Sequence, residues 1–250
     1  VLRAGEVVPV RLNPHVDYGV VPSPAGTAAR SLALPVAVAT DGAGTRVFVA
    51  AMGSDAVAIL PAGALETGGI IPDEADHVAV SGGGPVGLAV DDARGRLYVA
   101  TRFDDGLSVV DLATRSEIQH LRMFDPEPVG VREGRRYLYD ARFSSSNGEN
   151  ACASCHVFGH LDALAWDLGD PDLSSVPNPN ALAPLPSAGG WITNRRFHPM
   201  KGPMTTQTLR GIAHDGPMHW RGDRTTGVLS PSDSSDERSS FLQFAEAFES

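Results

Sequence analysis

The chain has 250 residues and a formal net charge of −10, and 42% of its residues are hydrophobic while 20% are charged. This length suits one large domain or two ordinary ones, and the composition is that of a globular protein. No stretch approaches the roughly 18 consecutive apolar residues that indicate a membrane-spanning helix. The acidic balance argues against a general nucleic-acid binder, which needs clustered Lys and Arg. We therefore predict neither a membrane span nor a nucleic-acid partner.

The first half of the chain repeats itself. One copy begins at Pro35 and a second begins at Pro85, 50 residues later, and both alternate apolar with polar residues between turns rich in Gly and Asp. Alternation with a period of two predicts short β-strands, three in each copy. A repeat of about 40 to 50 residues built from short strands is typical of the blades of a β-propeller.

These two copies resemble the YVTN type of β-propeller repeat. Residues 48–51 and 98–101 stand where that family has its tetrad, although neither matches it fully. A generic β-meander is the alternative interpretation. A third, partial copy covers residues 128–140, and we expect it to join the propeller-like part to the next domain. Because a propeller ring typically needs four to eight blades, we expect either a longer parent chain or other chains that complete the array.

The second half differs in composition. Both cysteines and all three tryptophans lie beyond residue 150. Residues 167–190 are rich in proline and show no helical period, so we expect an irregular segment there. Near the end, Phe241, Phe244 and Phe248 fall at the spacing of one helix face. The sequence thus predicts a multi-domain chain, with all-β propeller-like blades over residues 1–125 and a mainly helical and irregular domain over residues 126–250.

Residues 152–156 read Cys-Ala-Ser-Cys-His, the C-x-x-C-H signature of c-type haem attachment. Two thiols three residues apart on a helical turn can reach both vinyl groups of one porphyrin, and the imidazole of His156 can then ligate the iron. A zinc half-site and a thioredoxin-like dithiol are the alternatives. Zinc would need a second Cys or His pair, and a dithiol would need a βαβ setting. We predict one covalent haem c, bound by Cys152, Cys155 and His156.

The sixth iron ligand stays open at the level of sequence. Met204 is the first candidate, because the Gly-Pro step at residues 202–203 would bring its backbone close to the haem. The other candidates, in order, are Met200, Met218 and His198. A methionine that only packs against the porphyrin edge, or an open sixth position, is the alternative. We set His160 aside because we expect it on the same short helix as His156.

Residues 206–211 and 216–223 resemble a pattern in the bacterial dihaem cytochrome c peroxidase family, in which a Thr-Pro-Thr-Leu-Arg-Asn stretch precedes an aromatic-His-Asp-Gly step. The resemblance covers about residues 140–250. It implies that Leu209 and Arg210 line the haem domain, with Arg210 at a haem propionate. It also implies that His219 takes the place of the family's histidine.

The chain departs from that family in two respects. It has one C-x-x-C-H where the family carries two haems in each chain, and residues 244–248 hold no methionine where the family has the ligand of its electron-accepting haem. Peroxidase activity therefore does not carry over from the resemblance, and whether the chain is an enzyme stays open. With both parts in one sequence, the chain resembles bacterial cell-envelope proteins that fuse YVTN-type blades to a peroxidase-like haem domain.

These features predict a c-type cytochrome that transfers one electron through its haem, with the propeller-like part as a scaffold or as a docking surface for a redox partner protein. One alternative is a peroxidase- or oxygenase-like haem enzyme with an open sixth site. Another is a binding subunit that works with other chains in a larger multihaem assembly. Because c-type haem matures outside the cytoplasm, we expect a periplasmic, extracellular or cell-envelope location.

Overall fold

The computed structural model describes residues 2–3, 5–20, 22–70, 72–166, 176–177, 196–197 and 204–212. Contacts between Cα atoms divide the chain into two compact units, residues 1–154 and 155–250. The domain boundary expected between residues 125 and 126 stays a prediction. Among the helices of the described residues, none is long and apolar enough to cross a membrane.

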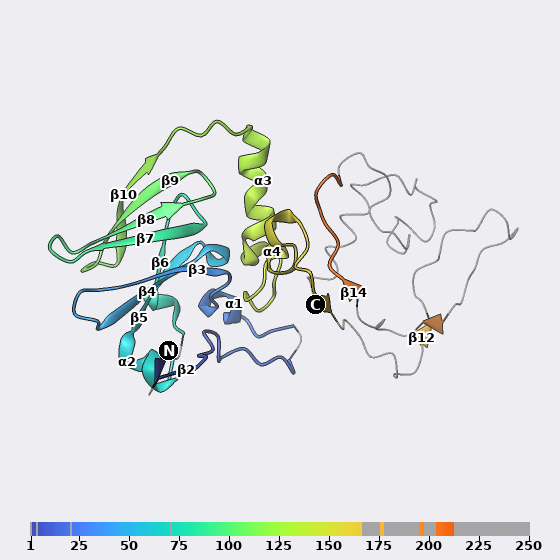
Figure 1. The fold of residues 1–250 in the computed structure, drawn as a ribbon, viewed down its shortest axis with the longest axis horizontal. Helices are drawn as coiled ribbons and strands as arrows, with labels where there is room; N and C mark the ends of the chain where they lie inside the picture. The colour runs from blue at the N-terminus through green and yellow to red at the C-terminus, as the bar shows by residue number, and fades with distance from the viewer. Residues whose placement is uncertain are drawn as a thin grey trace, which may run out of the picture. The chain divides into compact units, whose positions relative to one another are not determined.

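The first unit contains two four-stranded antiparallel sheets (Figure 1). The strands of the first sheet are β3 (Pro35–Thr40), β4 (Arg46–Ala51), β5 (Ala56–Pro61) and β6 (His77–Ala79). Those of the second are β7 (Pro85–Asp91), β8 (Arg96–Thr101), β9 (Gly106–Asp111) and β10 (Ser116–Arg122). Consecutive strands are neighbours in both sheets, which is the meander arrangement of a propeller blade. The predicted β-rich repeat is confirmed.

Each copy of the repeat has four strands, and the prediction of three was wrong. The additional strands are β6 and β10, which lie at one edge of their sheets. β6 is only three residues long, and β10 is mostly polar, so neither shows a clear apolar alternation. Edge strands of natural sheets are often short or carry charged side chains, which discourages pairing with another chain.

The two copies share more than strand count. A register shift interrupts β3 between Pro35 and Ala37, and the same shift interrupts β7 between Pro85 and Gly87. The turns after β4 and β8 each place an aspartate in the left-handed region, Asp55 at φ 51° and Asp105 at φ 53°. Asp tolerates this conformation better than most residues. Equivalent positions of the repeat therefore adopt equivalent backbone geometry, as two blades of one array would.

The main core lies between the two sheets. It is formed by Phe48, Val57, Ile59, Val78, Val80, Leu97, Val99, Val110 and Leu112. A second cluster covers the other face of the first sheet and contains Leu32, Val49, Ala51, Ala58, Leu60 and Ile70. Because side chains alternate along a strand, Phe48 enters the first cluster and its neighbour Val49 enters the second. The strands β4 and β5 are thus buried on both faces, whereas β3 exposes Val36 and Val38.

The third, partial copy of the repeat forms no strand over residues 128–140. The segment is a helix, α3 (Val129–Tyr139), which begins directly after Pro128. Val129 and Val131, which correspond to strand residues of the other copies, are 54% and 52% exposed. Arg135, on the buried side of the helix, pairs with Asp105 and so connects α3 to the turn after β8.

The remaining elements are short. They are β1 (Leu2–Arg3), β2 (Glu6–Val7), α1 (Thr27–Arg30), η1 (Met52–Ser54), α2 (Ala62–Thr67), η2 (Glu74–Asp76), η3 (Ala141–Phe143), α4 (Cys152–Cys155), η4 (Val157–Gly159), β11 (Ala165–Trp166), β12 (Val176–Pro177), β13 (Arg196–Phe197) and β14 (Met204–Thr205). In the second unit, β11 pairs with β14 and β12 pairs with β13. The helix expected over residues 241–248 and most of the irregular segment 167–190 lie outside the described residues.

Candidate functional site

The first three residues of the C-x-x-C-H motif end the first unit, and its last two begin the second. Cys152–Cys155 form one helical turn, as the motif requires. At the start of this turn, the Ser154 hydroxyl accepts a hydrogen bond from the Ala151 N–H at 3.1 Å, and the Ser154 N–H donates to the Ala151 carbonyl at 2.9 Å. Ala151 and Ala153 are buried. The turn is therefore fixed by reciprocal bonds and by small apolar side chains.

The environment of Cys152 disfavours a redox-active dithiol. Burial raises the pKa of the Cys152 thiol above its ordinary value, and a hydrogen bond with Ser144 offsets this only in part. Thioredoxin-like cysteines need the opposite shift, because the thiolate is the nucleophile. Over the described ranges, the one cluster of possible metal ligands contains neither cysteine.

The imidazole of His156 is held in one tautomer. Its Nδ1 atom lies 2.7 Å from the carbonyl oxygen of Gln207. A carbonyl can only accept, so Nδ1 carries the proton and Nε2 keeps its lone pair. A backbone carbonyl on the distal ring nitrogen is the usual partner of a metal-ligating histidine, since it orients the ring and raises its basicity. This contact leaves Nε2 of His156 as the ring nitrogen that could bind a metal when the ring is neutral.

Two segments about 50 residues apart in the sequence lie side by side around this bond. The N–H of Leu209 donates to the carbonyl of Gly159 at 3.0 Å, and Nδ1 of His160 lies 2.8 Å from the Thr208 hydroxyl. The structure thus brings the residues after the C-x-x-C-H motif into contact with residues 207–210, which the sequence singled out separately.

His160 is not on the helix of the cysteines, and that expectation was wrong. α4 ends at Cys155, and the chain then turns through Phe158 at φ 53° and Gly159 at φ 70°. Two successive left-handed residues cannot continue a right-handed helix. His160 is turned toward Thr208 as a result.

Arg210 has a backbone partner. Its Nε and Nη2 atoms donate to the carbonyl oxygen of Phe158 at 3.4 and 3.2 Å. The haem-propionate role that the resemblance implies stays a prediction. Met204 begins β14, where its backbone pairs with Trp166. The remaining candidates lie outside the described residues, namely His198, Met200, Met218 and His219.

An exposed apolar strip follows the motif. Val157, Phe158, Leu161 and Leu164 are 38%, 74%, 41% and 54% exposed. These four residues lie within eight positions of one another in the sequence. Sequence reasoning missed this strip, although its signal was present in the apolar residues after His156. It also missed Gln207, for which no signal exists, because the functional group is a backbone carbonyl.

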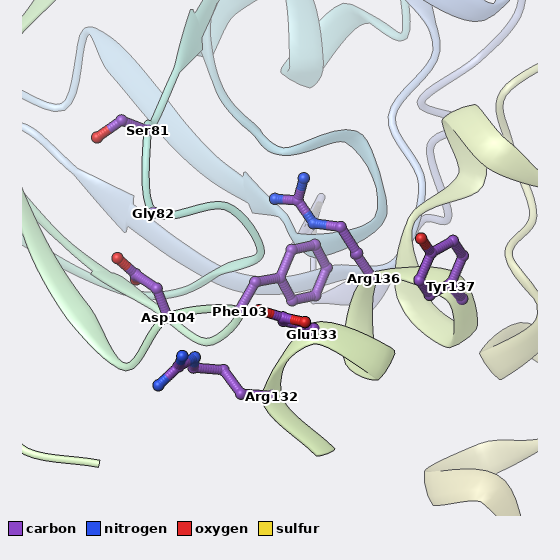
Figure 2. A pocket seen from close by; sticks show the side chains of 8 residues that line it. All are labelled: Ser81, Gly82, Phe103, Asp104, Arg132, Glu133, Arg136 and Tyr137. Carbon is purple, nitrogen blue, oxygen red and sulfur yellow. The ribbon is translucent and has the colours of Figure 1, made fainter. Parts of the chain in front are cut away.

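A separate pocket of about 350 Å³ lies in the first unit, between α3 and the turns that precede β7 and follow β8 (Figure 2). It is lined by Ser81, Gly82, Phe103, Asp104, Arg132, Glu133, Arg136 and Tyr137. The guanidinium of Arg136 lies 5.7 Å from the centre of the Phe103 ring, and Asp104 bonds to His120 at 2.6 Å. Its two arginines face two carboxylates, so the pocket carries no net charge that would select a ligand.

His120 also completes a Ser-His-Asp arrangement that the sequence did not reveal. Its Nδ1 lies 2.9 Å from the Ser108 hydroxyl, and its Nε2 lies 2.6 Å from Asp104. Ser108 is fully buried in β9, so no substrate can reach its hydroxyl. The arrangement satisfies polar groups inside the second sheet and is not a nucleophilic site.

The acidic cluster of Asp105, Asp125 and Glu127 brings three carboxylates within 4.8 Å of one another. Arginines already neutralise it: Arg135 lies 3.1 Å from Asp105 and Arg132 lies 3.6 Å from Asp125. The group connects α3 to the second sheet through ion pairs. It offers no argument for a metal ion.

No family model and no curated protein matches the chain. Among solved structures, it is similar to hydrazine synthase of Kuenenia stuttgartiensis, with 24% identity over 36% of this chain and 24% of that one, and a TM-score of 0.31. It is also similar to PpgL, a periplasmic gluconolactonase of Pseudomonas aeruginosa, with 16% identity over 38% of this chain and 27% of that one, and a TM-score of 0.32. The matches cover about a quarter of each of those proteins. TM-scores this low do not establish a common fold, so the description of propeller-like blades rests on the two sheets themselves.

Proposed function

We propose that this chain is a c-type cytochrome in which one haem is attached through Cys152 and Cys155 and ligated by His156. The observation that carries the proposal is the hydrogen bond from Nδ1 of His156 to the Gln207 carbonyl, 2.7 Å long. It fixes the tautomer that leaves Nε2 for iron.

The other residues of the site fit a haem. The helical turn of α4 sets Cys152 and Cys155 three residues apart, which places them on one side of the helix. The exposed side chains of Val157, Phe158, Leu161 and Leu164 provide apolar surface for a flat, mostly apolar macrocycle. When bound, the haem supplies one-electron oxidation and reduction. The carbonyl of Gln207 would hold the imidazole of His156 in place for the iron.

The finer parts of the proposal follow from the sequence. Met204 is the proposed sixth ligand, which would raise the reduction potential. The propeller-like blades would belong to a YVTN-type part fused to a peroxidase-like haem domain, and they would present a docking surface to a redox partner. The location would be the periplasm, the cell envelope or the exterior of a bacterium, where c-type haem is attached.

The test is to express the chain together with a c-type haem maturation system and to record its spectra. We expect a covalent haem that survives denaturing electrophoresis and a sharp reduced α-band that carbon monoxide does not change. A high-spin ferric spectrum with ready carbon monoxide binding would instead favour a haem enzyme with an open sixth site. Absence of covalent haem would overturn the proposal.

Two variants sharpen the assignment. Cys152→Ala with Cys155→Ala removes both attachment points, so no haem should remain on the denatured chain. His156→Ala should keep the thioethers but lose the low-spin spectrum, since the axial imidazole is gone. His77→Ala is the matched control, because His77 lies in β6 of the first sheet and should leave the spectrum unchanged.

A further inference from the structure

The turn after the motif is held in an unfavourable backbone conformation. Phe158 has φ 53° and ψ 34°, in the left-handed region that a residue with a large side chain rarely adopts. Such a conformation persists only where the surroundings over-determine it, and it is concentrated at functional sites. The Phe158 side chain is 74% exposed, so packing does not hold this residue in place.

Hydrogen bonds from residues 208–210 hold the turn instead. Arg210 donates twice to the Phe158 carbonyl, at 3.4 and 3.2 Å, and the Leu209 N–H donates to the next carbonyl, that of Gly159, at 3.0 Å. The Arg210 N–H also donates to the Thr208 hydroxyl at 3.2 Å. Two consecutive peptide carbonyls are thereby fixed by one short segment. A charged, forked donor such as Arg makes these bonds stronger and more directional than a neutral donor would.

The same segment holds the imidazole. Gln207, three residues before Arg210, supplies the carbonyl that accepts from Nδ1 of His156, two residues before Phe158. If Phe158 relaxed to a common backbone conformation, the peptide planes after His156 would rotate. The imidazole and the Gln207 carbonyl would then lose their alignment.

We propose that Arg210 is a positioning residue for His156, and that it acts through the Phe158 carbonyl and not through a haem propionate. The inference rests on the proposed haem site. By holding the turn at Phe158, Arg210 keeps the His156 Nδ1–H aimed at the Gln207 carbonyl. It thereby sets the orientation and the basicity of the iron ligand.

The two roles of Arg210 predict opposite changes in reduction potential. A weaker bond from Nδ1 makes the imidazole less basic, which stabilises ferric iron less, so Arg210→Ala should raise the potential of the holoprotein. If Arg210 paired with a propionate, its removal would take a positive charge away from the haem, which would stabilise ferric iron and lower the potential. Because Arg210→Ala removes the positive charge in both roles, Arg210→Lys, which keeps the charge, is measured beside it: a raised potential in Arg210→Lys shows the positioning role without the charge effect.

A second variant tests the route through Phe158. Glycine adopts the left-handed conformation without strain, so it needs no donor to hold it. The double variant Phe158→Gly with Arg210→Ala should therefore return most of the way to the potential and the ferric low-spin EPR g-values of Phe158→Gly alone. Arg210→Lys should be intermediate, because an ammonium lacks the forked geometry.

The experiment separates this inference from the proposed function. A wild-type chain without covalent haem overturns the proposed function. A haem-bearing wild type whose Arg210→Ala and Arg210→Lys variants both keep the same potential and g-values, or both show a lowered potential, overturns only the role of Arg210. Circular dichroism checks that each variant is folded. If Arg210→Ala alone does not fold, the double variant is compared with Phe158→Gly, and Arg210→Lys is compared with the wild type. A double variant whose potential and g-values stay far from those of Phe158→Gly contradicts the inference.

Discussion

Two phenylalanines show how differently the two regions of this chain are held together. Phe48 is fully buried between the two sheets, among eight other buried apolar side chains, and its position depends on packing. Phe158 is 74% exposed, and its backbone is held by hydrogen bonds from a segment about 50 residues away. Packing distributes stability over many contacts, whereas the site depends on a few specific bonds. Core substitutions should therefore lower global stability, and site substitutions should change local geometry.

The largest expected effect is a loss of stability in the core around Phe48. Phe48→Ala should lower the free energy of unfolding by about 3 to 5 kcal/mol, because it removes a large side chain and leaves a cavity in the core. Urea denaturation of the variant measures this loss. Val38→Ala is the control, since Val38 lies on β3 and is 69% exposed, and it should change stability by no more than about 0.5 kcal/mol. Equal losses for the two variants would contradict the assignment of the core.

Arg142 provides an intermediate case, because the buried carboxylate of Asp140 takes its side-chain hydrogen bonds from this one arginine. Its guanidinium lies 2.6 Å from Asp140, which is fully buried, and it also pairs with Asp55. Arg142→Ala should destabilise the first unit by about 1 to 3 kcal/mol, because it leaves a buried carboxylate without its strongest donor. Arg94→Ala is matched in chemistry but removes a side chain that is 75% exposed and screened by water, so the loss of stability should be clearly smaller than for Arg142→Ala. Thermal unfolding of both variants makes the comparison, and a larger loss for Arg94→Ala would contradict it.

The blades could be read from the sequence because their information is local. Each strand pairs with the next one along the chain, so alternation over a few residues indicates both the strands and their buried faces. The helix α3 was not predicted. Its valines are exposed, and its buried Arg135 bonds to Asp105, 30 residues earlier. No pattern within residues 128–140 carries that information.

The candidate site could be predicted only where chemistry fixes the spacing of side chains. Cys152, Cys155 and His156 form such a pattern. The Gln207 carbonyl could not be predicted, because every residue has one. The left-handed turn at Phe158 could not be predicted either, since Phe normally avoids that conformation and only the bonds from Arg210 and Leu209 explain it.

A substitution at Thr208 tests the hydrogen-bonded site around Phe158 separately from the core around Phe48. Thr208→Val removes the hydroxyl that bonds to His160 and accepts from the Arg210 N–H, while it keeps the shape of the side chain. We expect a local loss of about 0.5 to 1.5 kcal/mol, seen as faster hydrogen exchange at the Arg210 amide, with unchanged urea unfolding of the blades. Thr206→Val, two positions earlier, is the control. If Thr208→Val shifted the unfolding of the blades instead, the two regions would not be held independently.

The smallest effect concerns acid, and it compares the two blades with each other. The Arg46 side chain and the Arg46 N–H hold the pKa of Asp41 well below its ordinary value, with help from Thr45. Asp91, the equivalent residue 50 positions later, has its pKa lowered by Arg94.

A carboxyl whose folded pKa is depressed stabilises the protein above its unfolded pKa of about 3.9, and this stabilisation is lost as the pH falls toward the folded value. Asp41→Asn should therefore flatten the fall in stability below about pH 5, and Asp91→Asn should do so less. Urea unfolding between about pH 3 and pH 6 measures both slopes. An unchanged acid slope in Asp41→Asn would mean that this carboxyl gains nothing from its arginine, and that the turn is held by its backbone alone.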